Sequence, residues 1–154
     1  MKLGLISDTH DFLDPRIADL FKGVQHILHA GDIGRPALLV ELELIAPVTA
    51  VTGNTDDPAL GYRLTRTVEL AGHKFLIEHI VNPRDLSDDL QSRLARARPD
   101  VVVFGHTHKP FCEQIGDTLF FNPGYAGKHR FNLPRTVALL HCEGKELRHE
   151  FIPL

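Results

Sequence analysis

Cysteine is scarce in this chain of 154 residues. Only Cys112 and Cys142 are present, and they do not form a C-x-x-C pair. Without that spacing or a secretory signal, neither a disulfide framework nor a thiolate zinc site is expected. We therefore expect both cysteines to be reduced and structural.

Long apolar runs and an excess of positive charge are also missing. No apolar run is long enough to span a bilayer, and the N-terminal segment KLGLIS is too short for the core of a signal peptide. The net charge is −3, with no basic cluster of the kind that binds duplex nucleic acid. These absences predict a cytoplasmic protein that binds neither membrane nor duplex nucleic acid.

Histidine, in contrast, is abundant, with ten copies in the chain. Imidazole is the commonest metal ligand among side chains and titrates near neutral pH. The charged fraction of 24% and the hydrophobic fraction of 43% are ordinary for a globular protein. We expect a single domain over residues 1–154.

The first half of the chain alternates strand and helix patterns. Apolar runs at 2–7, 24–30 and 47–53 predict buried strands. Apolar residues at helical spacing predict helices over 14–22 and 35–45, with Pro15 and Pro36 in their first turns. Such β-α-β-α-β order implies parallel strands whose carboxyl ends meet at one sheet edge, where ligands usually bind.

The second half adds mostly antiparallel patterns. Segments 63–71 and 74–80 predict a hairpin that turns at Gly72-His73. Residues 83–98 predict a helix with acidic residues first and arginines last, the order that suits the helix dipole. Further strands are expected at 100–105, 111–115 and 118–122, and over 136–152 with a turn at Glu143-Gly144. A mixed α/β sandwich of two sheets accommodates this order.

Side chains that ligate metals follow five of these apolar runs. They are Asp8, His10, Asp32, Asn54, His79, His106 and His108. In Asp8-x-His10 and His106-x-His108, residues two apart on an extended chain would face the same side. Glycines at 31, 53 and 105 precede three of the ligands, which favours a sharp turn or a close approach of the backbone.

The ligand types indicate which metal is expected. Imidazole, carboxylate and amide oxygen without thiolate suit manganese, iron, zinc or nickel, whereas calcium is disfavoured by so many nitrogens. Seven ligands exceed the need of one ion but suit two ions that share a bridging carboxylate, for which Asp32 is the candidate. We expect two divalent metal ions, with manganese as the first choice.

The motifs DTH (8–10), GD (31–32), GN (53–54), a lone histidine after a strand, and GHTH (105–108) occur in this order. In this respect the chain resembles the calcineurin-like metallophosphoesterase superfamily. The segments HAGDIG, GNTD, GHTHKP and NPG resemble its small bacterial and archaeal phosphodiesterase branch. The resemblance covers nearly the whole chain and implies an α/β/β/α sandwich of four layers, with a dinuclear site at the sheet edge.

The resemblance also implies how the ligands are divided between the ions. One metal would be held by Asp8, His10, Asp32 and His108. The other would be held by Asp32, Asn54, His79 and His106. Catalytic roles are expected for Asp32, Asn54, Asp56 and His106.

Three positions depart from the family pattern. Thr55 stands where larger members have a histidine that is thought to protonate the leaving group. Ile80 stands where a glycine usually follows the ligand histidine, which puts the role of His79 in doubt. Tyr125 stands where the family often has serine, so the substrate pocket is expected to differ.

Three further residues have two interpretations each. His29 on a predicted buried strand is either a core histidine with satisfied nitrogens or a residue that orients Asp32. Lys109 either contacts the substrate phosphate or is a solvated loop lysine. Thr55 is a candidate substrate contact besides replacing the usual histidine.

The sequence therefore predicts a metal-dependent phosphodiesterase that acts on a small phosphoester. Two cations would lower the pKa of a bridging water that attacks phosphorus. Activated diesters are expected to be preferred, because Thr55 provides no general acid. A phosphomonoesterase or nucleotidase is the alternative enzyme, and a protein-docking scaffold like the small subunit of retromer is the alternative without catalysis. The sequence leaves the oligomeric state open, a homo-oligomer included.

Overall fold

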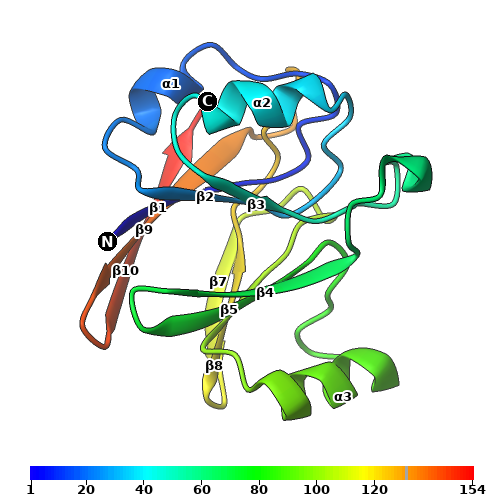
Figure 1. Cartoon of the computed structure of the whole chain (residues 1–154), viewed down its shortest axis with the longest axis vertical. Coiled ribbons are helices and arrows are strands. Elements are labelled where there is room, and N and C mark those ends of the chain that lie inside the picture. The colour runs from blue at the N-terminus through cyan, green and yellow to red at the C-terminus, as the bar shows by residue number, and fades with distance from the viewer. Residues whose placement is uncertain (131) are drawn as a thin grey trace.

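The computed structural model describes residues 1–130 and 132–154. Two mixed five-stranded sheets lie face to face (Figure 1). The first has the order β10-β9-β1-β2-β3. Its strands are β1 (Lys2–Ile6), β2 (His26–His29), β3 (Val48–Ala50), β9 (Thr136–Glu143) and β10 (Glu146–Pro153).

The second sheet has the order β4-β5-β6-β8-β7. Its strands are β4 (Thr65–Leu70), β5 (His73–Glu78), β6 (Val101–Val103), β7 (Phe111–Ile115) and β8 (Thr118–Asn122). Helices α1 (Ile17–Leu20) and α2 (Ala37–Glu43) cover the outer face of the first sheet, and α3 (Asp88–Ala97) covers that of the second (Figure 1). A 3₁₀ helix, η1 (Pro58–Leu60), connects β3 to β4. The four-layer α/β/β/α sandwich implied by the family resemblance is thus confirmed.

Apolar side chains fill the three spaces between the layers. Along β1, Leu3 and Leu5 point into the core between the sheets, whereas Ile6 belongs to the core under α1 and α2. This alternation follows from the two-residue period of a strand that is buried on both faces. A Cβ atom at Gly4 would lie 2.7 Å from the ring of Phe21, so the glycine lets this ring pack directly on β1.

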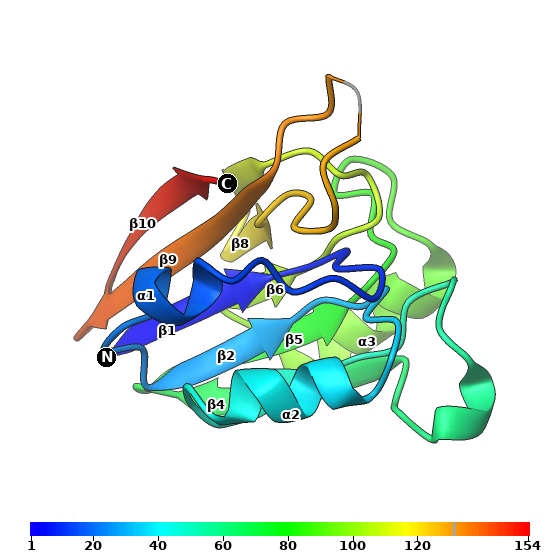
Figure 2. The same ribbon diagram turned by 90° about the horizontal axis from the view of Figure 1, so that it is seen from above.

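The parallel strands bring their carboxyl ends to the same edge. Strands β1, β2 and β3 run parallel in the first sheet, and β5, β6 and β8 run parallel in the second. Figure 2 shows the arrowheads of β1, β2 and β5 pointing toward the same end of the sandwich. Loops from both sheets therefore meet there.

Several element boundaries differ from the sequence prediction. Helix α2 spans Ala37–Glu43, with Pro36 as its N-cap rather than in its first turn. Helix α1 has only four residues and leaves Pro15 outside, because the Asp14 side chain accepts the backbone N–H of Arg16 in a preceding turn (3.0 Å). Helix α3 begins at Asp88 rather than near residue 83, because the hydroxyl of Ser87 caps it by accepting the N–H of Leu90 (3.2 Å). The β4–β5 turn lies at Ala71-Gly72, one residue earlier than expected.

The described part of the chain contains neither a disulfide nor a helix that could span a membrane. Cys112 and Cys142 are both free thiols, as the sequence predicted. Within residues 1–130 and 132–154, no helix combines the length and the apolar character needed to cross a membrane.

Candidate metal centre

Asp8, two residues after the end of β1, is fully buried and is bound by residues of three loops. Its Oδ2 atom accepts hydrogen bonds from the Ser7 hydroxyl (2.7 Å) and from the backbone N–H of His106 (3.1 Å). The backbone N–H of Asp8 donates to the carbonyl of Gly31 (3.0 Å). Its other oxygen, Oδ1, lies 3.1 Å from Nε2 of His108. One oxygen is therefore anchored by the protein, and the other faces imidazole.

Asp32 follows β2 and shows the same division between its two oxygens. Oδ1 accepts the backbone N–H of Thr55 (2.9 Å). Oδ2 lies 3.2 Å from Nε2 of His79 and 3.6 Å from Nε2 of His10. This oxygen thus lies between a histidine of the first sheet's loops and one of the second sheet's, which suits the predicted bridging role.

His79 reaches this group from the end of β5. Its Nδ1 atom lies 2.7 Å from the carbonyl of Ala30, a distance at which Nδ1–H donates. In the neutral ring, Nε2 is then unprotonated and available as a ligand. Ile80, which stands where the family usually has glycine, points outward with 53% exposure. The departure at Ile80 therefore does not remove His79 from the group.

The remaining predicted ligands lie nearer to solvent. Nδ1 of His106 lies 3.0 Å from the amide oxygen of Asn54, and both residues are exposed. The ring of Tyr125 stacks on His108 with centroids 4.7 Å apart and lies 6.1 Å from His10. Tyr125 is fully buried, so this ring restrains both imidazoles.

The backbone at the site is not extended, so that part of the sequence prediction is wrong. Five predicted ligands have positive φ angles in the left-handed region: Asp8 (55°), His10 (44°), Asp32 (53°), His106 (68°) and His108 (60°). This conformation costs a non-glycine residue about 1–2 kcal/mol. The D-x-H and H-x-H pairs converge through these tight turns, and strain of this kind is typical of functional sites.

The three glycines before the ligands are required by close packing and backbone conformation. A Cβ atom at Gly53 would lie 2.1 Å from Oδ1 of Asp32, and one at Gly105 would lie 2.1 Å from the Ser7 hydroxyl. Gly31 has a φ of 99°, which side chains disfavour. These contacts confirm the turn and the close approaches that the sequence predicted.

Three buried polar atoms at the centre of the site have no hydrogen-bond partner among the described residues. They are Oδ1 of Asp8, Nε2 of His10 and Nε2 of His79. Both imidazole nitrogens lie 3.8 Å from Oδ1 of Asp8. Leaving such an atom unsatisfied costs about 1–3 kcal/mol.

The ligand atoms form two adjacent groups, Asp8-His10-His108 and Asp8-Asp32-His79, in each of which they lie within 4.8 Å of one another. The donor set of carboxylates and imidazoles fits divalent cations, which would satisfy all three unpartnered atoms.

Comparisons with known proteins identify the family of this chain. The family model described as the calcineurin-like phosphoesterase superfamily domain matches residues 1–145. The chain belongs to this superfamily. A probable metallophosphoesterase of Methanothermobacter thermautotrophicus is 35% identical over 159 residues, covering 99% of this chain and 92% of that protein. A phosphodiesterase of Methanocaldococcus jannaschii is 32% identical, with 96% and 97% covered.

The fold of the superfamily also occurs in a solved structure with little sequence identity. A Vps29 protein of Entamoeba histolytica, solved in complex with zinc, has a TM-score of 0.76 and 21% identity, with 99% of each chain covered. At this identity the likeness shows the shared fold alone.

Asp32 and His79 shift each other's pKa values. Burial alone would raise the pKa of Asp32, but the neighbouring His79 and the N–H of Thr55 outweigh it and hold this pKa below its usual range. Burial would likewise lower the pKa of His79, but the Asp32 and Asp8 carboxylates and the carbonyl of Ala30 raise it. Without a metal, a proton on His79 would partly compensate the carboxylates.

Asp56, for which the sequence predicts a catalytic role, accepts backbone N–H groups on both of its oxygens. Oδ2 accepts from Gly53 (2.9 Å) and Ile33 (3.1 Å), and Oδ1 accepts from Gly34 (2.9 Å). These bonds fasten the loop after β3 to the loop after β2. The contacts of Asp56 are those of a positioning residue for Asp32 and Asn54.

His29 has features of both of its interpretations. Nδ1 accepts the N–H of Gly31 (3.2 Å), so Nε2–H donates to the hydroxyl of Thr9 (3.0 Å). Complete burial lowers the pKa of His29 to about 4, which keeps the ring neutral. Both nitrogens are satisfied, and the bonds they make hold residues adjacent to Asp8, His10 and Asp32.

Thr55 and Lys109 lie at the exposed side of the site. The side chain of Thr55 is exposed, while its backbone binds Asp32. Lys109 and His106 line a cavity of about 480 Å³ beside Ile80 and Phe111. A substrate group bound there would meet Lys109, which remains a candidate contact.

Sequence reasoning missed three groups that support the ligands. They are the Ser7 hydroxyl on Asp8, the Ala30 carbonyl on His79 and the Tyr125 ring on His108. A backbone carbonyl carries no sequence signal, and Ser7 was visible only as the last residue of a strand. Tyr125 was noticed, but as a pocket residue.

Proposed function

We propose that this protein is a phosphodiesterase that hydrolyses a small phosphodiester with two divalent cations. The observation that carries the proposal is the convergence of three unpartnered buried ligand atoms between Asp8, His10 and His79. Carboxylate and imidazole ligands without thiolate favour manganese, with iron, zinc or nickel as alternatives. Membership of the phosphoesterase superfamily supports this reading.

The seven residues divide into two ligand sets that share Asp32. Asp8, His10, Asp32 and His108 would hold one cation, and Asp32, Asn54, His79 and His106 would hold the other. Cations held there would lower the pKa of a water nucleophile and neutralise phosphate oxygens. Ser7, Thr55 and Asp56 keep the carboxylates and the Asn54 loop in place through their hydrogen bonds.

The exposed residues of the site suggest which ester is cleaved. Asn54 and His106 face outward, where the amide and the imidazole can contact a phosphate oxygen. At position 55 the threonine hydroxyl is too weak an acid to protonate a leaving group at neutral pH. General-acid catalysis is typically worth about 10²–10⁴-fold, so its lack favours esters with a good leaving group. The likeness to a named phosphodiesterase points in the same direction.

The test is an assay of manganese-loaded protein on aryl phosphodiesters and on alkyl phosphomonoesters. We expect faster hydrolysis of the diesters. In Asp32→Asn, metal content and activity should fall by at least about 100-fold, since loss of a group that only supports a ligand already costs about 10–100-fold. Asp19→Asn, at an exposed helix position, is the matched control and should keep both.

Two results would redirect the proposal. A preference for alkyl monoesters would favour a phosphomonoesterase or nucleotidase. Unchanged cellular function of Asp32→Asn, despite lost metal, would favour a protein-docking scaffold, the alternative without catalysis. Thr55→His separates the enzyme hypotheses further, because an added imidazole should raise alkyl-ester hydrolysis up to about 100-fold, whereas Thr55→Gln should not.

A further inference from the structure

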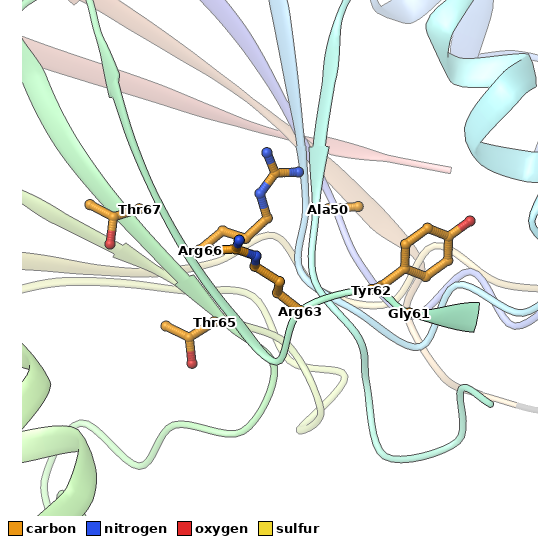
Figure 3. A pocket seen from close by; sticks show the side chains of 7 residues that line it. All are labelled: Ala50, Gly61, Tyr62, Arg63, Thr65, Arg66 and Thr67. Carbon is orange, nitrogen blue, oxygen red and sulfur yellow. The ribbon is translucent and has the colours of Figure 1, made fainter. Parts of the chain in front are cut away.

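A cavity of about 630 Å³ lies beside two edge strands, β3 of the first sheet and β4 of the second (Figure 3). Its lining residues are Ala50, Gly61, Tyr62, Arg63, Thr65, Arg66 and Thr67. None of them is a candidate metal ligand. A volume of about 300–1,000 Å³ is typical of sites for small organic ligands.

The cavity is lined by two arginines and no acidic residue. Figure 3 shows the guanidinium groups of Arg63 and Arg66 between the strand that carries Ala50 and the strand that carries Thr65 and Thr67. Within the described part of the chain, neither guanidinium has an ion pair. Other arginines do pair with carboxylates, namely Arg16, Arg35, Arg84, Arg93, Arg135 and Arg148.

The positive charge here is not neutralised by nearby residues. His26 in β2 has its pKa lowered by burial and, next, by the charge of Arg66. Glu78 accepts the Thr65 hydroxyl, but it already forms an ion pair with Arg93 (2.9 Å). Both arginine side chains are exposed, so their guanidinium groups are accessible to a ligand from solvent.

The backbone that carries these arginines is held in place. The N–H of Thr52 donates to the carbonyl of Arg63, and the Thr52 hydroxyl donates to the carbonyl of Tyr62, both at 2.9 Å. Arg66 lies within β4, paired with Ile77 of β5. Both arginines therefore project from ordered backbone rather than from a free loop.

We infer that this cavity is a second ligand site, which binds a phosphate group. Guanidinium is planar, always charged and able to bind phosphate oxygens through two parallel hydrogen bonds. Two such groups in one cavity match the charge of a phosphate dianion. The cavity has more room than one phosphate requires, so free phosphate and a phosphate carried by an organic molecule are both accommodated.

Calorimetric titration of the full chain with inorganic phosphate and with adenosine monophosphate tests this inference. Each titration is made with manganese-loaded protein and again in a chelator. Binding in the cavity should persist without metal, whereas binding at the metal centre should not. Tighter binding of the nucleotide would identify a phosphate on an organic group as the ligand, and equal affinities would identify the free ion.

Variants and chemical-shift mapping locate the site. Arg63→Ala and Arg66→Ala should each weaken metal-independent binding by about 10-fold or more, as expected for loss of a charge-assisted hydrogen bond. Arg148→Ala removes the same charge at an exposed position and should leave it unchanged. Phosphate should shift the backbone resonances of residues 61–67. Absence of metal-independent binding, equal loss in Arg148→Ala, or shifts confined to the strand-end loops would overturn the inference.

Discussion

Buried carboxylates at two places in this protein have different charged neighbours. Asp14 is 5% exposed and bound by two arginines: Nε and Nη2 of Arg16 lie 2.9 and 2.8 Å from its oxygens, and Nη2 of Arg135 lies 3.0 Å away. Asp8 and Asp32 are buried at least as deeply. Within the described residues, however, their ion-pair partners are all histidines.

Asp14 has all its hydrogen-bond partners within the fold, whereas Asp8 does not. Hydrogen bonds from Arg16 hold the pKa of Asp14 below its usual range, and both of its oxygens are satisfied. At the metal centre, Oδ1 of Asp8 is left without a partner. The fold supplies a permanent positive charge at Asp14, whereas the described neighbours of Asp8 and Asp32 are titratable imidazoles. Divalent cations would supply a permanent charge there.

The largest expected effect is stabilisation by metal. A ligand at 100 times its dissociation constant stabilises the folded state by about 2.7 kcal/mol, so two cations would add about 5 kcal/mol. For a chain of this size, that is a rise in Tm of about 10–20 °C. Thermal unfolding in manganese and in chelator measures it. The rise in Tm should persist in Asp14→Asn and disappear in Asp8→Asn. An equal rise in both variants would show that Asp8 does not bind the metal.

The second-largest expected effect is on the stability of the metal-free protein, in which Asp14 should matter more than Asp8. In chelator, Asp14→Asn should lower the free energy of unfolding by about 3 kcal/mol, because Arg135, with only 8% of its side chain exposed, loses its charged partner. Asp8→Asn should change this free energy by less than about 1 kcal/mol, because the native oxygen lacks a partner. Urea unfolding of the two variants measures the difference. A larger loss in Asp8→Asn would show that its charge is compensated within the fold.

A third prediction concerns how the stability of the protein in chelator depends on pH. The pKa of His29 is lowered to about 4 in the folded state, against about 6.5 when unfolded, so the unfolded chain binds the proton first as the pH falls. His29 should therefore remove about 3 kcal/mol of stability between pH 6.5 and pH 4. Asp14, with its lowered pKa, loses its contribution only below about pH 4.

Urea unfolding across this pH range separates the two groups. His29→Gln should flatten the fall in stability between pH 6.5 and pH 4, whereas Asp14→Asn should leave the slope in that range unchanged. Parallel curves for the wild type and His29→Gln would mean that His29 takes up its proton in the folded protein as readily as in the unfolded chain.

The sequence was sufficient to predict the sandwich and to propose its ligands, because apolar runs that end in Asp, Asn or His mark buried strands and their loops. It could not predict the backbone of those loops. A left-handed φ at Asp8 or His106 is imposed by hydrogen bonds to distant loops, such as the one from Asp8 to Gly31. Local residue types do not encode these bonds.

The same limit applies to Asp56. The sequence shows a carboxylate near a predicted ligand but not the groups that bind it. The N–H groups that occupy it belong to Ile33, Gly34 and Gly53, two of them more than 20 residues away. Helix α1 starts late because Asp14 accepts the backbone N–H of Arg16, and the same Asp14 also binds Arg135 from the far end of the chain. The cavity lined by Arg63 and Arg66 likewise could not be predicted, because it lies beside edge strands of two different sheets.

The smallest expected effect tests how the metal-facing histidines are held. Tyr125→Phe removes the hydrogen bond from the hydroxyl to the carbonyl of Lys128 (2.9 Å) and should cost about 1 kcal/mol of stability. The ring still stacks on His108, so manganese should raise the Tm as much as in the wild type. Tyr125→Leu keeps an apolar side chain without the aromatic ring and should weaken manganese binding. If Tyr125→Phe weakened binding equally, the hydroxyl rather than the ring would be what aligns His108, and the metal centre would depend on the Lys128 loop.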